Sequence, residues 1–374
     1  MKLSKILILF LFSLMAAGLI FLQWQKTEKA LADNEIFITP TAVIPNPAPP
    51  KKEAPAQIKG IYLTAYSAGN SKKLEKIIDL IKKTELNAAV IDIKDYSGKV
   101  LYDSQLELVK KLKLKNNRIG DATALIKKLH DNEIYVIARL TVFQDPELAK
   151  YRPEWAFKNK NGKIWRDKLG LAWVDAGNKN IWRYNLALAK EATALGFDEI
   201  NFDYVRFPSD GRIRDINFKL EGKKKYEIMK DFFQYLNQEM AESNVKTSLD
   251  FFGLTMEQRD DMNIGQRLVD AVDEVDYISP MMYPSHYYSG HLGFKNPADH
   301  PKEVIANGIK KGLPLFDGKR AKFRPWLQAF NLGAKYDGEK IRAQIDEVEK
   351  QPNAGWLLWN AANRYTEAGL KKES

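Results

Sequence analysis

The 374-residue sequence contains no cysteine. This absence excludes structural disulfides, thiolate zinc sites and a cysteine nucleophile, and it suits a protein that is exported to an oxidising compartment. The motifs of several other enzyme classes are missing too. There is no G-x-S-x-G nucleophile turn, no G-x-x-x-x-G-K-[ST] phosphate loop and no G-x-G-x-x-G dinucleotide turn. We therefore expect no cofactor.

Histidine is scarce, with only four in the chain. Three of them, His286, His291 and His300, fall close to Asp299 in the sequence, which leaves a metal-dependent hydrolase such as a deacetylase open. Their spacing matches no standard helical zinc motif, so we favour a site without metal. His286 is the better candidate for contacting substrate or relaying a proton, because it follows SPMMYPS directly.

Charge of one sign is only mildly in excess: the formal net charge is +10, mostly from scattered lysines. No nucleic-acid reading module accompanies these lysines, so we expect no nucleic-acid partner. An anionic cell envelope is an equally natural partner for such a surface.

The N-terminus argues for export. Lys2 and Lys5 precede a largely apolar run over residues 6–22. This run is long for a signal-peptide core and slightly short for a membrane span. Ala30-Leu31-Ala32 is a candidate cleavage site, but charged residues separate it from the run. Residues 1–24 are therefore predicted to be a signal peptide or, with slight preference, an uncleaved membrane anchor, and both place the rest of the chain outside the cytoplasm.

Residues 25–57 are predicted to form an extended linker, because they are rich in proline and show no helical or strand period. From residue 58 to the C-terminus the pattern of apolar and polar residues is of one kind, which indicates one domain over residues 58–374. There short apolar runs alternate with longer amphipathic ones. The candidate strands are KGIYLTAY (59–66), NAAVIDIKD (87–95), EIYVIARLTVF (133–143), DEINFDYVRF (198–207), KTSLDFFGL (246–254), VDYISPMMY (275–283), FRPWLQAF (323–330) and AGWLLWNA (354–361).

Helices are predicted near residues 71–83, 120–131, 178–195, 223–243, 262–273, 299–311 and 338–349. Eight strands with intervening helices give the α/β class and predict a (β/α)8 TIM barrel. An open doubly wound sheet is the competitor, but no glycine-rich nucleotide turn follows any strand. The longest connection, residues 144–177, holds Trp155, Trp165 and Trp173. We expect it to overhang the carboxyl-terminal face of the barrel, where barrel enzymes place their sites.

Polar side chains recur where the strands end. In EINFDYVRF, Asn201 and Asp203 share one face, opposite Ile200 and Phe202. Burying an unpaired carboxylate costs several kcal/mol, so each of these residues needs a partner or a function. A single aspartate can simply cap a helix, and Asp92 with Lys94 can form a structural ion pair. Polar residues at the ends of several strands, however, converge on one face and predict a site.

Two carboxylates are the usual apparatus of glycoside hydrolysis, and Asp203 and Asp250 are the inward pair on neighbouring strands. We therefore predict that Asp203 and Asp250 are catalytic and that the substrate is a polysaccharide or oligosaccharide, whose rings stack on tryptophan and tyrosine. The candidate substrate contacts are Asp92, Lys94, Asp95, Arg139, Asn201, Arg206, Tyr283, His286, Gln328, Trp359 and Asn360. Asp210, in PSDG, is interpreted as a turn residue.

These segments also carry a family resemblance. GFDEINFDYVRFPSDG (196–211), with VIDIKDYSG upstream and YISPMMYPSHY and GWLLWNA downstream, resembles the bacterial putative glycoside hydrolase family, a TIM-barrel family related to amylase-like and chitinase-like barrels. The resemblance covers about residue 58 to the C-terminus, and the fourth-strand stretch is its most specific part. It implies an extracytoplasmic glycoside hydrolase of undefined substrate.

The resemblance also implies roles. In amylase-like barrels the fourth-strand aspartate is the nucleophile, here Asp203, and the fifth strand supplies the acid, for which this chain offers Asp250 in place of a glutamate. In chitinase-like barrels the catalytic glutamate would fall on Val205, which cannot act as an acid. A non-catalytic carbohydrate-binding barrel is therefore the alternative.

Overall fold

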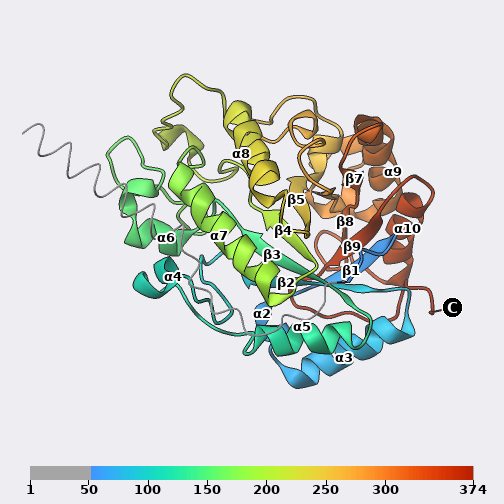
Figure 1. Cartoon of the computed structure of the whole chain (residues 1–374). Coiled ribbons are helices and arrows are strands. Elements are labelled where there is room, and N and C mark those ends of the chain that lie inside the picture. The colour runs from blue at the N-terminus through green and yellow to red at the C-terminus, as the bar shows by residue number, and fades with distance from the viewer. Residues whose placement is uncertain (1–51, 374) are drawn as a thin grey trace, which may run out of the picture.

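The computed structural model describes residues 52–373 (Figure 1). The predicted signal peptide or anchor and most of the predicted linker lie outside the described residues. Within residues 52–373, no helix combines the length and the apolar character needed to cross a membrane. The end of the predicted linker contacts the domain, since the backbone N–H of Lys52 donates to Oδ1 of Asp198 at 2.7 Å.

Parallel strands close into a barrel, which confirms the predicted fold class. The strand order is β5-β4-β3-β2-β1-β9-β8-β6, and an additional pairing of β5 with β6 closes the ring. The strands are β1 (Ile58–Leu63), β2 (Ala88–Lys94), β3 (Tyr135–Thr141), β4 (Glu199–Asp203), β5 (Lys246–Phe252), β6 (Tyr277–Met281), β7 (Lys322–Phe323), β8 (Trp326–Gln328) and β9 (Gly355–Trp359).

The seventh position of the barrel is split between two short strands. β7 and β8 both pair with β6, and Arg324 and Pro325 separate them. Proline has no N–H to donate to a ladder, so the strand predicted over residues 323–330 breaks there. Counting β7 and β8 as one position gives the eight positions of a TIM barrel.

Helices surround the strands (Figure 1). They are α2 (Ala65–Ala68), α3 (Ser71–Lys83), α4 (Glu107–Lys111), α5 (Ala122–His130), α6 (Pro146–Tyr151), α7 (Lys179–Leu195), α8 (Lys225–Met240), α9 (Pro301–Gly312) and α10 (Gly338–Glu349). Six of the predicted helices are thereby confirmed. The helix predicted over residues 262–273 is wrong: Met262, Asn263 and Gly265 all have positive φ, which ends any helix, and only a 3-10 turn forms at Leu268–Asp270.

The strands separate two apolar clusters. Side chains such as Ile200 and Phe202 pack outward against the helices, and a second cluster that includes Val90, Ile137 and Leu357 fills the barrel interior. Below the carboxyl ends the interior also holds a fully buried ion pair. Arg324 donates to both carboxylate oxygens of Glu199. Polar side chains therefore continue from the middle of the barrel up to its mouth.

The long connection after β3 forms its own small packed unit. Trp155, Trp165 and Trp173 are each at most 4% exposed, because they pack inside this connection and against the loop after β4. These three rings are therefore not available to stack on sugar rings. The connection supports the residues beside it instead, since the ring of Trp173 lies 5.0 Å from the guanidinium of Arg206.

Candidate active site

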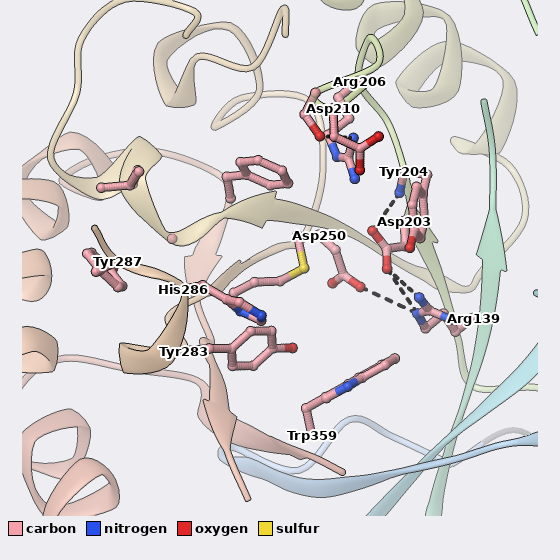
Figure 2. A pocket seen from close by; sticks show the side chains of 15 residues that line it. Arg139, Asp203, Tyr204, Arg206, Asp210, Asp250, Tyr283, His286, Tyr287 and Trp359 are labelled. Carbon is pink, nitrogen blue, oxygen red and sulfur yellow. Dashed lines mark hydrogen bonds and ion pairs between the residues drawn. The ribbon is translucent and has the colours of Figure 1, made fainter. Parts of the chain in front are cut away.

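A cavity of about 500 Å³ opens at the carboxyl ends of the strands (Figure 2). Its size lies within the range of small-molecule pockets, about 300–1,000 Å³. The side chains that line it come from β3, β4, β5, β6, β9 and the loops that follow β4, β5 and β6. They are Arg139, Asp203, Tyr204, Arg206, Ser209, Asp210, Asp250, Phe252, Gly253, Leu254, Met281, Tyr283, His286, Tyr287 and Trp359.

β4 ends abruptly at Asp203. The next residue, Tyr204, has φ +54°, in the left-handed region that bulky residues avoid. This conformation turns the chain out of the strand, and the backbone N–H of Tyr204 donates to Oδ1 of Asp203 at 2.5 Å. The strained turn therefore fixes the carboxylate at the cavity and places the Tyr204 ring in its wall.

Both oxygens of Asp203 accept hydrogen bonds. Oδ2 accepts from Nε of Arg139 at 3.1 Å and also from Nη2, while Oδ1 accepts from Tyr204. A carboxyl group whose two oxygens act only as acceptors is in the arrangement of an ionised carboxylate. Figure 2 shows Asp203 and Arg139 in direct contact along one side of the cavity.

Arg139 lies at the centre of the acidic groups. Its Nη1 donates to Oδ1 of Asp92 at 2.5 Å, and its guanidinium lies over the rings of Tyr62 and Trp359 at 5.5 and 4.9 Å. Asp92 also accepts from the Tyr62 hydroxyl at 2.5 Å. Burial raises the pKa of Asp92 to about 6, although the charge of Arg139 opposes this shift. Asp92 thus anchors Arg139 from beneath the cavity.

The two carboxyl oxygens of Asp250 differ in their hydrogen-bond partners. Oδ1 accepts from Nδ2 of Asn201 at 2.9 Å and from Nε1 of Trp326 at 2.8 Å. Oδ2 accepts no hydrogen bond from the described residues, and Nε of Arg139 lies 3.8 Å from it. Burial, and after it the charge of Asp203, raises the pKa of Asp250 to about 8. At neutral pH the carboxyl is protonated, and its proton belongs on Oδ2 because Oδ1 already faces two N–H donors.

Aromatic side chains form another part of the wall. Trp359 stacks on Tyr62 with ring centroids 3.8 Å apart, and the ring of Tyr283 meets that of His286 at 5.2 Å. Burial raises the pKa of the Tyr283 hydroxyl, so it remains a neutral donor at pH 7. Partial burial lowers the pKa of His286, which lies at the exposed rim and is therefore neutral at pH 7. A planar apolar surface with neutral polar groups at its edge suits a sugar ring.

The structure brings seven of the predicted site residues to the cavity: Arg139, Asp203, Arg206, Asp250, Tyr283, His286 and Trp359. Asp92 and Asn201 lie directly beneath, where they bind Arg139 and Asp250. The other predicted contacts bind elsewhere. Asp95 accepts from Ser97, Gln328 accepts from the N–H of Ser285, and Asn360 donates to the carbonyl of Ala329.

The expectation that Lys94 shares the inward face with Asp92 is wrong. The pairing of β2 with β3 shifts register between these two residues, which turns Lys94 to the other side of the strand. Its Nζ lies 2.8 Å from Oδ2 of Asp145 and 3.2 Å from Oδ1 of Asn185 on α7, and its side chain is fully buried. Lys94 therefore forms a structural ion pair, but with Asp145 and not with Asp92.

Several residues of the cavity wall were not predicted from the sequence. They are Tyr204, Ser209, Phe252, Gly253, Leu254, Met281 and Tyr287, together with Asp210, which was interpreted as a turn residue alone. Most of them follow β4, β5 or β6 by a few positions. In a parallel barrel such positions belong to the functional face, and this position in the sequence was the available signal.

The residues considered for a metal site have separate partners. His291 lies 3.2 Å from Glu257, the ring of His300 stacks on Phe294 at 3.8 Å, and Asp299 accepts from Asn296. Across residues 52–373 no group of three or more histidine, cysteine, aspartate or glutamate side chains is arranged to hold a metal ion.

The protein is thus an α/β protein, a TIM barrel with two carboxyl groups at its mouth. The family model described as "Putative glycosyl hydrolase domain" matches residues 60–365, and the chain belongs to this family. This confirms the resemblance found in the sequence. No curated protein sequence matches the chain.

The solved structures that are similar to this chain include the following three. A hypothetical protein from Ruminiclostridium thermocellum is 40% identical, over 51% of this chain and 96% of that one, with a TM-score of 0.48. The PgaB (BpsB) glycoside hydrolase domain from Bordetella bronchiseptica is 14% identical, over 83% of this chain and 94% of that one, with a TM-score of 0.55. TtGalA, an alpha-galactosidase from Thermus thermophilus, is 14% identical, over 84% of this chain and 60% of that one, with a TM-score of 0.52. At 14% identity the last two likenesses show the shared barrel fold alone.

Proposed function

We propose that the chain is a glycoside hydrolase that cleaves glycosidic bonds of a polysaccharide outside the cytoplasm. The observation that carries the proposal is the contrast between the two carboxyl groups. Asp250 is protonated with its proton on Oδ2, whereas both oxygens of Asp203 accept hydrogen bonds. An acid and an ionised carboxylate facing one cavity are the pair that glycoside hydrolysis needs. The family and the barrel fold shared with glycoside hydrolases support the same class.

The reaction follows from these two states. Asp250 donates its Oδ2 proton to the glycosidic oxygen while the bond from that oxygen to C1 breaks, and the bonding electron pair stays on the leaving sugar. The carboxylate of Asp203 bonds to C1. Water then attacks C1 and gives a proton to the ionised Asp250, and the bond from C1 to Asp203 breaks. Both carboxyl groups return to their starting states.

The spacing of the carboxyl groups is short enough for this two-step course. Nε of Arg139 lies 3.1 Å from Oδ2 of Asp203 and 3.8 Å from Oδ2 of Asp250. Two oxygens that share one nitrogen at these distances are less than about 7 Å apart, and they come closer as the angle at the nitrogen falls below a straight line. Retaining glycosidases place their carboxyl groups about 5–5.5 Å apart, and inverting ones about 6.5–9.5 Å.

The test is product release from a panel of bacterial and plant polysaccharides by the full-length protein and two variants. Asp203→Asn and Asp250→Asn each keep the size of the side chain but remove the ionisable group. We expect the wild type to release reducing sugars from at least one polymer, and each variant to lose about a hundredfold or more of that activity. Hydrolysis that survives Asp203→Asn unchanged would rule out this assignment.

One observation favours a second candidate, a non-catalytic carbohydrate-binding barrel. Arg139 donates two hydrogen bonds to Oδ2 of Asp203, so a cation neutralises the carboxylate that would attack C1. Val205, at the place of the chitinase-type glutamate, is buried in the apolar cluster outside the barrel. Retained glycan binding in both asparagine variants, with no product from the wild type, would support this candidate.

The location outside the cytoplasm is also part of the proposal. It rests on Lys2 and Lys5, the apolar run over residues 6–22, the proline-rich residues 33–57 and the absence of cysteine. Protease added to intact producing cells should degrade the barrel and spare a cytoplasmic marker protein. Protection of the barrel until the cells are lysed would contradict this location.

A further inference from the structure

Three arginines are buried among residues 52–373, and one of them lacks an acidic partner. Arg139 binds Asp92 and Asp203, and Arg324 binds Glu199 through two hydrogen bonds. Arg206 is 8% exposed and forms no ion pair with any described residue. A buried arginine without a paired acid is unusual, because removing a guanidinium from water costs several kcal/mol.

Aromatic rings surround the Arg206 guanidinium. The rings of Trp173, Tyr204 and Phe252 lie 5.0, 4.9 and 4.6 Å from it. Cation–π contacts of this kind offset part of the desolvation, and they hold the planar group in one orientation. Burial nevertheless lowers the pKa of Arg206, which shows that the surrounding charges compensate incompletely.

The hydrogen-bonding capacity of Arg206 is also largely unused. Nη1 donates to Oγ of Ser209 at 3.1 Å, and Nε is buried without a partner among the described residues. A guanidinium carries five N–H donors, so the side chain is prepared for a further acceptor. Because Arg206 lines the cavity, that acceptor can arrive with the substrate.

The position of Arg206 fits a substituent of the sugar and not the bond that is cleaved. In Figure 2, Arg206 and Asp210 lie at one end of the cavity, Tyr283 and Trp359 lie toward the other, and Asp250 lies between them. Asp203 and Asp210 attract the guanidinium over a distance, but neither forms an ion pair with it. The fork of an arginine matches a carboxylate or a phosphate.

We infer that the cavity binds an acidic glycan, and that an anionic group on the sugar, a carboxylate or a phosphate, pairs with Arg206. This inference rests on the proposed function, since it names the substrate class of the same site. The incoming anion replaces the water that the buried guanidinium lost, so its charge-assisted hydrogen bonds form where water competes little. Neutral glycans leave Arg206 without a partner and bind more weakly.

The experiment is a calorimetric binding assay of the full-length protein in detergent solution, with Asp250→Asn as the background so that no ligand is cleaved. The ligands are oligogalacturonate, its neutral counterpart oligogalactose, and a phosphorylated mannan oligosaccharide beside unmodified mannan. The Asp250→Asn protein, with Arg206 and Asp210 unchanged, should bind one acidic ligand about tenfold or more tighter than its neutral partner, which corresponds to one charged hydrogen-bonded contact. Preference for the carboxylate or for the phosphate identifies the anion.

Two substitutions with opposite expected effects test the role of Arg206. Arg206→Gln should remove the preference for the acidic ligand and leave binding of the neutral one within about twofold. Asp210→Asn should strengthen acidic binding only, because it removes an exposed negative charge from the same end of the cavity. Asp210 is exposed, so this variant tests the inference even if the buried Arg206→Gln variant does not fold.

The outcomes separate this inference from the proposed function. Equal binding of acidic and neutral ligands by the Asp250→Asn protein would overturn the inference. A further Asp210→Asn substitution that strengthens the binding of both ligands equally would also overturn it. Acid-selective binding that depends on Arg206, with no hydrolysis by the wild type, would support the inference and contradict the glycosidase. Hydrolysis of neutral polymers alone would support the glycosidase and contradict the inference.

Discussion

Nε1 of Trp326 donates a 2.8 Å hydrogen bond to Oδ1 of Asp250. Because this indole N–H cannot accept, it keeps the acidic proton away from Oδ1 and directs it to Oδ2, which faces the cavity. Trp326 is fully buried in the barrel interior and does not line the cavity, so it acts as a positioning residue for Asp250.

Trp326→Phe removes this hydrogen bond, which lowers the pKa of Asp250 in the wild type. We expect the pKa of Asp250 to rise, so the alkaline limb of the pH–rate profile should move to higher pH while kcat falls. Trp356→Phe is the matched control, because Trp356 is equally buried but faces the helices. An unchanged alkaline limb in Trp326→Phe would show that Trp326 does not position the proton.

The pH dependence of activity follows from Asp250 as the acid. Because burial raises its pKa to about 8, hydrolysis should fall as the pH rises through about 8. Values of kcat/KM, determined from initial rates between about pH 5 and pH 10, measure this decline. A limb near the ordinary aspartate pKa of about 4 would assign the proton donor to another residue.

Stability should change with pH in a defined direction. Between the unfolded pKa of about 4 and the folded value, the native state holds a proton on Asp250 that the unfolded chain has lost. The free energy of unfolding therefore decreases as the pH rises from about 4 to about 8, and this contribution is constant above that range. Asp250→Asn should flatten the decline in urea unfolding curves. A variant that keeps the full decline would place the responsible group elsewhere.

The buried pair of Glu199 and Arg324 predicts a large loss of stability when one partner is removed. Glu199→Gln or Arg324→Met leaves a charge uncompensated in the barrel interior and should lower the free energy of unfolding by about 3–5 kcal/mol. The double variant should lose less than the sum, as measured by urea unfolding. Lys127→Ala, in an exposed pair with Asp131, is the control and should change the free energy by less than about 0.5 kcal/mol. Full additivity would mean that the buried pair is not coupled.

Because Tyr204 has a left-handed backbone conformation, we expect the usual stability order of a glycine and an alanine variant to be reversed at this position. At ordinary positions in helices and strands, glycine is about 0.5–1 kcal/mol less stable than alanine. At Tyr204, with φ +54°, Tyr204→Gly should be about 1 kcal/mol more stable than Tyr204→Ala, since both lose the ring and only alanine keeps the strain. Thermal unfolding of the two variants measures the difference. The ordinary order would mean that the turn relaxes when the ring is removed.

The stereochemistry of the first product tests the proposed two-step course. We expect the anomeric configuration of the substrate to be retained, because in the proposed two-step course Asp203 bonds to C1 before water attacks. Proton NMR of the product during the first minutes of hydrolysis, before mutarotation, gives the configuration. Inversion would mean that Asp203 activates water instead of attacking C1.

Periodicity determined much of the fold. Apolar residues that alternate in the strands and repeat at helical spacing between them predicted the barrel, and the side-chain period of two placed Asp203 and Asp250 inside it. The ends of the strands indicated the functional face. These features are local in the sequence, so they can be found without the structure.

Only the tertiary structure determined the orientation, burial, protonation and charge pairing of the individual side chains. The register shift in β2 turned Lys94 away from Asp92, and the packing of the long connection buried its tryptophans. The proton on Asp250 and the unpaired charge of Arg206 depend on distances to Trp326, Asp203 and the aromatic rings, which come from separate elements. Spacing along a chain can show which residues reach one face, but only their arrangement in space sets desolvation and charge, and therefore chemistry.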